Sequence, residues 1–372
     1  MRIIWVGWRG GGGVPPQLAV CEALLEAGHE VIAIADPQVA QQAERIGARF
    51  EAIDEPPPPA GATWAEIHRW SLQDKFLGSI YAEAMRAAIT RYEPDRVLVD
   101  GALFSAQVEA KASGIPYAAL WVQLAVTAEN WAGGADPQDR ASNLAAHNAH
   151  RNQRGLAEVT AIRDTHLDAD WLLTLSYETL NRAHRRRSPN LHFVGAPLPK
   201  SADVDVELPP GDAPLVLVGF STTPITTAAD LQTVVDALAG MNVRALVTLG
   251  RVEPGELDLP LNVAETRFAP HDQVLPHADL MVSHVGHGSL CAAARHGVPI
   301  LALPWGRDQH VNAETLTDLG LGLSLPSGST AEEIADAAGR VLADDAIRRT
   351  CSDVAAEIAT HAGLDEAVRL IS

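Results

Sequence analysis

Residues 276–312, PHADLMVSHVGHGSLCAAARHGVPILALPWGRDQHVN, constrain the fold more than any other part of this 372-residue chain. An apolar run from Asp279 to Ser283 predicts a buried strand, and an alanine-rich segment ending at His296 predicts a helix. A Gly-Val-Pro sequence at 297–299 ends that helix before a second apolar run at 300–303. A strand, a turn, a helix and a strand in this order predict an α/β fold with a parallel sheet.

The turn within this stretch has the chemistry of a phosphate site. Gly286 and Gly288 let a ligand approach the backbone closely. The helix that starts near Gly288 has N–H groups without partners and a partial positive charge at its first turn, which suit a phosphate. His284 adds a further hydrogen-bond donor. Turn glycines that bind nothing are the alternative, because a short histidine-glycine motif is by itself weak evidence.

Three pieces of this region resemble the signature of nucleotide-sugar glycosyltransferases of the GT-B fold, within the UDP-glycosyltransferase superfamily of bacterial natural-product type. The pieces are 284–289, the Gly-Val-Pro segment at 297–304, and Asp308 and Gln309 followed by Asn312; Val285 stands where the family often has glycine. The resemblance implies two Rossmann-like parallel-sheet domains that face each other across a cleft. It also implies residues that hold the diphosphate and the sugar: His284, Gly286, Gly288, Ser289, Asp308 and Gln309.

Two further segments resemble nucleotide-sugar contacts of the same family. Ser221 and Thr222 follow a strand expected at 215–220 and would donate to phosphate oxygens, with helix capping as the alternative. Phe268 would stack on the base, and the backbone of Ala269 would read its edge. Because stacking tolerates any base, the resemblance leaves uracil and thymine open.

The first half of the chain predicts another βαβ unit, with strands at 2–6 and 30–35 and a helix that begins at Pro15 or Pro16. The glycine-rich turn between them matches a dinucleotide fingerprint poorly. It resembles instead the acceptor-side turn of the same glycosyltransferases, which places Gly12 and Gly13 near the acceptor. In that family a histidine of this turn usually takes the acceptor's proton, and Gly13 stands at its position.

Glycine has no side chain to accept a proton, so another residue is needed for this task. Asp100, which follows a strand expected at 96–99, is our candidate for the catalytic base, and His68, Asp136 and His147 are further candidates. Capping of the next helix is the alternative role for Asp100. An acidic acceptor that needs no base, or a catalytically weak or accessory homologue that binds a sugar nucleotide or activates a partner enzyme, would also explain the glycine.

Three tryptophans are candidates for an apolar acceptor cavity, with plain core packing as the alternative: Trp64, Trp70 and Trp121. The first two lie in a segment, 63–92, that predicts a helix in two pieces around Gly78. Residues 138–168 are polar and predict further helix.

Length and charge limit the classes of protein and partner that this sequence allows. A chain of 372 residues predicts two domains. We expect an acceptor-binding domain at 1–195, a linker at 196–213 and a nucleotide-sugar domain at 214–355. A C-terminal helix at 356–372 is expected to pack back on the first domain. The net charge of −19 argues against a nucleic-acid partner. No apolar run is long enough for a transmembrane helix, and widely spaced cysteines indicate ordinary thiols, so we expect a cytoplasmic protein.

The resemblance implies an enzyme that moves a hexosyl or deoxyhexosyl group from a UDP- or TDP-sugar to an apolar natural product. Transfer would invert the anomeric carbon and need neither a metal ion nor a cofactor. The expected partners are the aglycone and the sugar nucleotide, and a homodimer is left open. A sugar-nucleotide epimerase and a membrane-surface transferase are the rivals; the acidic composition counts against the second.

Overall fold

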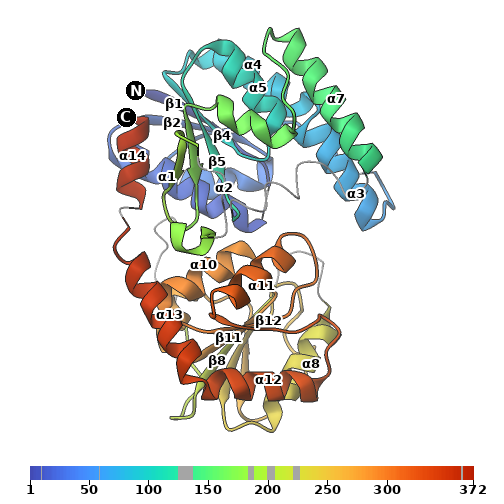
Figure 1. Ribbon diagram of the computed structural model, residues 1–372, viewed down its shortest axis with the longest axis vertical. Coiled ribbons are helices and arrows are strands. Elements are labelled where there is room, and N and C mark those ends of the chain that lie inside the picture. Colours follow the sequence, from blue (N-terminus) through green and yellow to red (C-terminus); the bar gives the residue numbers. More distant parts are fainter. Residues whose placement is uncertain are drawn as a thin grey trace. The chain divides into compact units, whose positions relative to one another are not determined.

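The computed structural model describes residues 1–372 except 10, 58, 125–136, 183–187, 199–205, 221–226 and 362, and except the side chains of Trp64, Ala65 and His68. The chain forms two compact units (Figure 1). Unit 1 comprises Met1–Ser201 together with Ala362–Ser372, and unit 2 comprises Ala202–His361. Both are α/β units with a parallel sheet, which confirms the predicted fold class.

Unit 1 is built on a seven-stranded parallel sheet of order β3-β2-β1-β4-β5-β6-β7. Its strands are β1 (Arg2–Val6), β2 (Glu30–Ala35), β3 (Arg49–Ala52), β4 (Arg96–Asp100), β5 (Tyr117–Trp121), β6 (Trp171–Thr174) and β7 (Leu191–Phe193). Its α-helices are α1 (Val14–Glu26), α2 (Ala40–Arg45), α3 (Trp64–Trp70), α4 (Ser79–Tyr92), α5 (Phe104–Ser113), α7 (Pro137–Gln153) and α14 (Leu364–Ile371). Shorter turns of helix are the 3₁₀ segments Gly11–Gly13, Pro37–Val39, Ile162–Asp168 and Glu178–Asn181, and a π-helix, Ser71–Phe76.

Both faces of this sheet are covered. Side chains alternate along a strand, so Ile4 of β1 packs on the face covered by α4 and α5, whereas Ile3 packs on the face covered by α1, α2 and α14. The C-terminal helix α14 lies beside α1, and its Ala367 and Ile371 are buried in that second core (Figure 1). The chain returns to unit 1 at residue 362, a few residues beyond the expected boundary at 356.

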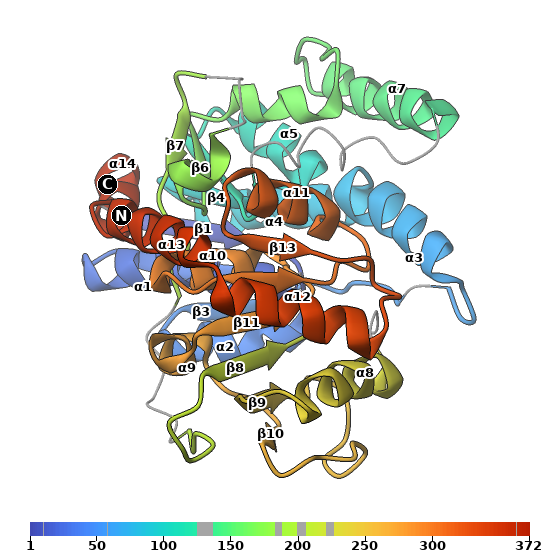
Figure 2. The ribbon, with the colours of Figure 1, turned by 60° about the horizontal axis from the view of Figure 1, so that its bottom comes forward.

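Unit 2 is built on a six-stranded parallel sheet of order β10-β9-β8-β11-β12-β13 (Figure 2). Its strands are β8 (Leu215–Gly219), β9 (Arg244–Thr248), β10 (Val263–Thr266), β11 (Leu280–Ser283), β12 (Ile300–Ala302) and β13 (Gly322–Ser324). Its helices are α8 (Ala228–Ala239), α9 (His271–Val274), α10 (His287–His296), α11 (Gln309–Asp318), α12 (Ala331–Ala343) and α13 (Asp345–Ile358), with a 3₁₀ turn at Leu275–His277. Helices α8 and α12 bury one face of the sheet, and α10 packs against α13.

Local sequence signals explain several of these boundaries. Thr330 begins α12 with a capping box, because its side chain accepts from the Glu333 N–H while the Glu333 carboxylate accepts from the Thr330 N–H. Gly78 separates the π-helix from α4 as expected, since a Cβ atom there would lie 2.4 Å from the Asp74 carbonyl oxygen. The continuous helix expected at 138–168 is wrong: α7 ends at Gln153, and only a 3₁₀ segment follows.

The strand order reverses once in each sheet, between β1 and β4 in unit 1 and between β8 and β11 in unit 2. Open α/β sheets bind ligands beside the carboxyl ends of the strands at this reversal. We call these places the switch point of unit 1 and the switch point of unit 2. The described residues include no helix with the length and apolar character needed to cross a membrane.

Candidate active site

The start of helix α10 forms the centre of the switch point of unit 2. Gly286 precedes the helix and offers no capping side chain, and the N–H of Leu290 is the first to bond back, to the Gly286 carbonyl at 3.0 Å. The N–H groups of His287, Gly288 and Ser289 therefore have no acceptor within the helix. Together with the helix dipole they form a place where a phosphate is stabilised.

His284 stands between the end of β11 and this helix start. Its Nδ1 atom is buried and has no hydrogen-bond partner among the described residues, while its ring bonds the backbone of Gly219 at the end of β8. Burial lowers the pKa of His284 to about 4, with Asp308 acting against the shift, so the ring is neutral at pH 7. A Cβ atom on Gly286 would lie 2.7 Å from Nε2 of this ring, so a larger residue would displace the imidazole.

The turn between β11 and α10 is strained at Val285. This residue has φ +52°, a left-handed conformation that β-branched residues rarely adopt, which explains why glycine is frequent here in the family that the motif resembles. The strained turn is fixed by two bonds: the Val285 N–H donates to Ser283 Oγ at 3.1 Å, and its carbonyl accepts from Asn312 Nδ2 at 3.0 Å. The sequence pattern did not indicate this clamp by Asn312.

Two residues after β12 that were predicted to bind the sugar, Asp308 and Gln309, already accept hydrogen bonds within the protein. Gln309 is 3% exposed, and its Oε1 accepts from the N–H groups of Trp305 at 2.8 Å and Gly306 at 3.2 Å. Asp308 accepts from Asn312 Nδ2 at 3.0 Å. Gln309 thus holds the loop in shape, and the contacts of Asp308 and Gln309 with sugar hydroxyls stay predictions.

Three aromatic residues follow strands of unit 2, and one of them, Phe220, lies near His284. The Phe220 ring, directly after β8, lies 6.4 Å from the His284 ring and meets the Trp305 ring edge-on at 5.0 Å. Phe268 is 66% exposed after β10, as a residue that stacks on a ligand would be, and Ala269 is buried. Ser221 and Thr222 lie outside the described residues.

At the switch point of unit 1, the glycine turn leads directly into helix α1. Gly13 has φ −80° and ψ −22°, which every residue can adopt, and a Cβ atom there would meet only Val122, at 3.9 Å. Gly11, in contrast, has φ +57°. The backbone conformation therefore requires glycine at Gly11 but not at Gly13. A residue with a side chain that accepts a proton would fit at position 13, and glycine supplies no such group.

Asp100 ends β4 at this same switch point. It is 7% exposed, and its Oδ1 accepts from the Ala102 N–H at 2.9 Å. Burial raises the pKa of Asp100 to about 6, while hydrogen bonds from Gln17, Ala102 and Trp8 act against the rise. The alternative role as a helix cap is wrong, because Leu103 occupies the N-cap position of α5 without any side-chain cap.

A buried ion pair lies in the π-helix of unit 1. Lys75 bonds the Glu55 carboxylate, which also accepts from the Tyr81 hydroxyl at 2.6 Å. The ammonium group lies 4.6 Å from the ring of Trp70 and 5.9 Å from the ring of Trp8. Trp70, a predicted acceptor contact, therefore packs on a charged group rather than in a purely apolar cavity. Short π-helices often mark functional sites.

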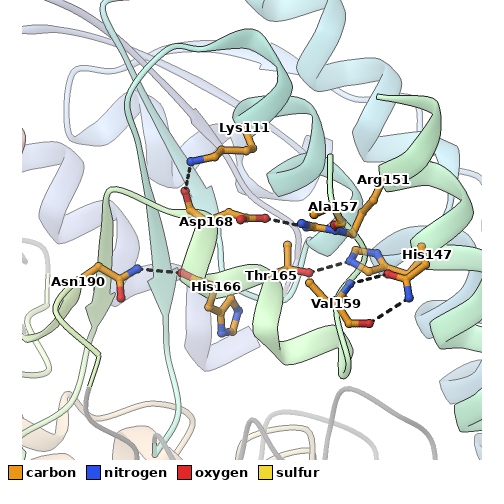
Figure 3. A network of polar contacts seen from close by, with 10 residues as sticks. Lys111, His147, Arg151, Ala157, Val159, Thr165, His166, Asp168 and Asn190 are labelled. Atoms are coloured by element: carbon orange, nitrogen blue, oxygen red, sulfur yellow. Dashed lines mark hydrogen bonds and ion pairs between the residues drawn. The ribbon is translucent and has the colours of Figure 1, made fainter. Parts of the chain in front are cut away.

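The prediction of His147 as a candidate for the catalytic base is wrong. It is 0% exposed, its Nε2 bonds Thr165 Oγ1 at 2.7 Å, and burial lowers its pKa to about 3 (Figure 3). The sequence did not identify His166, whose Nε2 bonds the Gly101 carbonyl at 2.8 Å and whose ring stacks on Phe104. His166 thereby supports the turn next to Asp100.

Other predicted residues have little exposed surface or lie outside the described part. Trp121 is 4% exposed, and its indole N–H donates to the Leu124 carbonyl at 3.2 Å, as in core packing. Asp136 and the side chains of His68 and Trp64 lie outside the described residues. Gly12 lies in the turn before α1, with open space around it.

The sequence is similar to several known glycosyltransferases. Residues 232–371 match the family described as erythromycin biosynthesis protein CIII-like, C-terminal domain. Demethyllactenocin mycarosyltransferase of Streptomyces fradiae is 35% identical over 176 residues, 46% of this chain and only 38% of that relative's length. Oleandomycin glycosyltransferase of Streptomyces antibioticus is 26% identical over 385 residues, 97% of this chain and 87% of the relative.

Solved structures match along the whole chain. The glycotransferase of kitacinnamycin superimposes with a TM-score of 0.84 at 26% identity, covering 100% of this chain and 97% of the other. The glycosyltransferase VinC, solved in complex with DTDP, has the same fold, with a TM-score of 0.78 at 21% identity and coverage of 100% and 99%. In fold, motif and relatives, this chain is similar to GT-B glycosyltransferases of the antibiotic-biosynthesis type.

Proposed function

We propose that this chain transfers a hexosyl or deoxyhexosyl group from a UDP- or TDP-sugar to an apolar natural product, with inversion and without a metal ion. The observation that carries the proposal is the start of α10. Three N–H groups there have no acceptor within the helix, and the buried Nδ1 of His284 has no partner among the described residues. A diphosphate supplies oxygen acceptors for the three N–H groups, and its charge would draw a proton onto the His284 ring so that Nδ1 donates as well. The complex of VinC with DTDP supports this choice of ligand.

The proposed step is a single displacement. The acceptor oxygen attacks the anomeric carbon while the bond from that carbon to the diphosphate oxygen breaks, which inverts the configuration. The nucleoside diphosphate leaves with the electron pair. The helix start at Gly286, Gly288 and Ser289, together with His284 once its ring is protonated, stabilises the growing charge. This positive potential does the task that a metal ion performs in other transferases.

Asp100 is the proposed base that takes the acceptor's proton. Because its pKa is about 6, the carboxylate is mostly ionised at pH 7 yet more basic than an exposed aspartate. A base whose pKa lies near the working pH is the most efficient. The other proposed contacts are Phe268 and Ala269 for the base, Ser221 and Thr222 for phosphate, Asp308 and Gln309 for the sugar, and Gly12, Gly13, Trp64, Trp70 and Trp121 for the aglycone.

Gly13 favours a second candidate function, a catalytically weak or accessory homologue. Such a protein would bind the sugar nucleotide and show no transfer. Incubation with TDP-glucose or UDP-glucose and a panel of phenolic and macrolide aglycones distinguishes the two, because any glycosylated product excludes a purely accessory role. The apolar aglycone, the homodimer and the cytoplasmic location stay predictions.

The binding part of the proposal is tested at Gly288. This residue is exposed, has no neighbour within 4 Å of an added Cβ atom and has no positive φ, so Gly288→Ala is expected to leave the fold intact. The methyl group would stand where the phosphate approaches the backbone. We expect calorimetry to show TDP or UDP binding to the unchanged protein and roughly tenfold or weaker binding to the variant, a change of about 1.4 kcal/mol.

Gly339→Ala is the matched control, because Gly339 lies inside α12 and also has open space around its Cα. It should stabilise the protein by roughly 0.5–1 kcal/mol without changing nucleotide binding. The proposal is wrong if the unchanged protein binds neither nucleotide, or if the two variants bind equally well.

A further inference from the structure

Gln17, a residue of helix α1, joins the glycine turn to Asp100. Its Nε2 donates to the Gly13 carbonyl at 3.1 Å and makes a short bond to Asp100 Oδ2. Its Oε1 accepts from the indole N–H of Trp5 at 2.9 Å. The side chain is 1% exposed, so these contacts are shielded from water.

The orientation of the Gln17 amide follows from its partners. An indole N–H only donates and a carbonyl only accepts, so Oε1 must face Trp5 and the NH₂ group must face Gly13 and Asp100. Both N–H donors of the amide are then used within the protein. Gln17 therefore acts on Asp100 and has no donor left for a substrate.

The contacts of Asp100 leave room for one more partner. An ionised carboxylate has about four acceptor positions. The Ala102 N–H, Gln17 and Trp8 use three of them. The remaining position is the one that the acceptor hydroxyl would need, and the three donors fix the direction in which it points.

We infer that Gln17 is the positioning residue for Asp100: it holds the carboxylate in one orientation and favours its ionised form, at a switch point where Gly13 supplies no side chain. The inference rests on the proposed function, because Asp100 needs positioning only if it accepts a proton. In this arrangement the Gln17 amide orients the Asp100 carboxylate and stabilises its negative charge, a task for which Gly13 has no side chain.

A purely structural role for Gln17 predicts a different outcome. If Gln17 serves only through its bonds to Trp5 and to the Gly13 carbonyl, its loss would lower stability, and the proton affinity of Asp100 would not change. The measurement must therefore report on the Asp100 carboxyl group itself, rather than on stability or activity alone.

The test is a carbon-13 NMR titration of the full chain with labelled aspartate carboxyl groups, in which Asp100→Asn identifies the Asp100 signal. Gln17→Met removes the donor to the carboxylate with little change in volume. Because a hydrogen bond to a charged group favours that form, we expect the titration midpoint of Asp100 to move to higher pH, equivalent to roughly a tenfold weaker acid.

Gln107→Met is the matched control. Gln107 is also fully buried, but its Nε2 donates at 2.9 Å to the Gly101 carbonyl and not to the Asp100 carboxylate. We expect no shift of the Asp100 midpoint in this variant. An unchanged midpoint in Gln17→Met, or an equal shift in both variants, would overturn the inference.

Gln17→Glu is the second variant, for the case in which Gln17→Met does not fold. It keeps an oxygen acceptor for the Trp5 indole and places a carboxyl group beside Asp100, so the midpoint should rise further. Because the titration needs no substrate, its result is independent of whether the unchanged protein converts TDP-glucose. Failure of the inference and failure of the proposed function therefore appear in separate measurements.

Discussion

The two units place their candidate sites at the same topological position, but the chemistry at the two positions is opposite. At the switch point of unit 2, the N–H groups at the start of α10 have no acceptor within the helix, and the Nδ1 atom of His284 has no partner among the described residues. At the switch point of unit 1, three donors converge on the carboxylate of Asp100. We therefore expect the shared fold to determine where a ligand binds, and the residues at the strand ends to determine which charge suits it.

The largest expected effect tests whether the Asp100 carboxylate takes the proton of the acceptor. Asp100→Asn keeps the size of the side chain but removes the proton acceptor. We expect transfer to fall by roughly 10²–10⁴-fold, the usual contribution of a general base. Calorimetry should show an unchanged TDP affinity, because the proposed nucleotide contacts belong to unit 2.

Asp36→Asn is the control for this variant. Asp36 also follows a strand of the unit 1 sheet, but it caps the next 3₁₀ turn by accepting from the Gln38 N–H at 2.8 Å, a bond that asparagine keeps. Transfer should survive in this variant. Equal losses in both variants would mean that the comparison between the two switch points is wrong.

The second effect concerns the buried ion pair of Lys75 and Glu55 in unit 1. Lys75→Met leaves the Glu55 carboxylate buried without its partner, and breaking such a pair costs roughly 3–5 kcal/mol of folding free energy. Lys75→Met with Glu55→Leu should recover most of this loss. Denaturant unfolding followed by tryptophan fluorescence measures unit 1, because every tryptophan except Trp305 lies in residues 1–201.

The exposed pair of Arg69 with Asp139 provides the control, at 3.4 Å in the same unit. Arg69→Met should cost about 0–1 kcal/mol. If Lys75→Met costs no more than Arg69→Met, the ion pair is not shielded from water in the way that the structure shows.

The smallest effect is a pH dependence of opposite sign at the two switch points. The pKa of Asp100 is raised from 3.8 to about 6, so the folded state holds this proton more tightly, and the contribution of Asp100 to stability falls as the pH rises from about 4 to about 6. The pKa of His284 is lowered from 6.5 to about 4, so its contribution is present above 6.5 and is lost as the pH falls toward 4.

The free energies of unfolding of Asp100→Asn and His284→Gln, measured between about pH 4.5 and 7.5, check this dependence. Relative to the unchanged protein, the first variant should gain stability as the pH rises and the second as it falls, each on the order of 1–3 kcal/mol. Two dependences of the same sign would mean that burial does not shift the pKa values of Asp100 and His284 in opposite directions.

Much of the fold was predictable because its signals are local. The apolar run of β1, the proline at the start of α1 and the capping box at Thr330 each depend on residues within a few positions of one another. The short strand β3 was not identified, because its four residues carry no clear apolar pattern. The π-helix was not identified either, since it differs from an α-helix only in hydrogen bonding.

The sequence by itself determined the two α/β units and the glycine-spaced helix start of the candidate nucleotide-sugar site, because strand, turn, helix and N–H groups follow one another directly along the chain. Only the tertiary structure decided which residues meet at the switch point of unit 1. It joined Gln17 to Asp100 across 83 positions, joined His166 to Gly101 across 65, and buried His147 completely. Such contacts depend on which strands become neighbours in the sheet, and no local periodicity encodes that order.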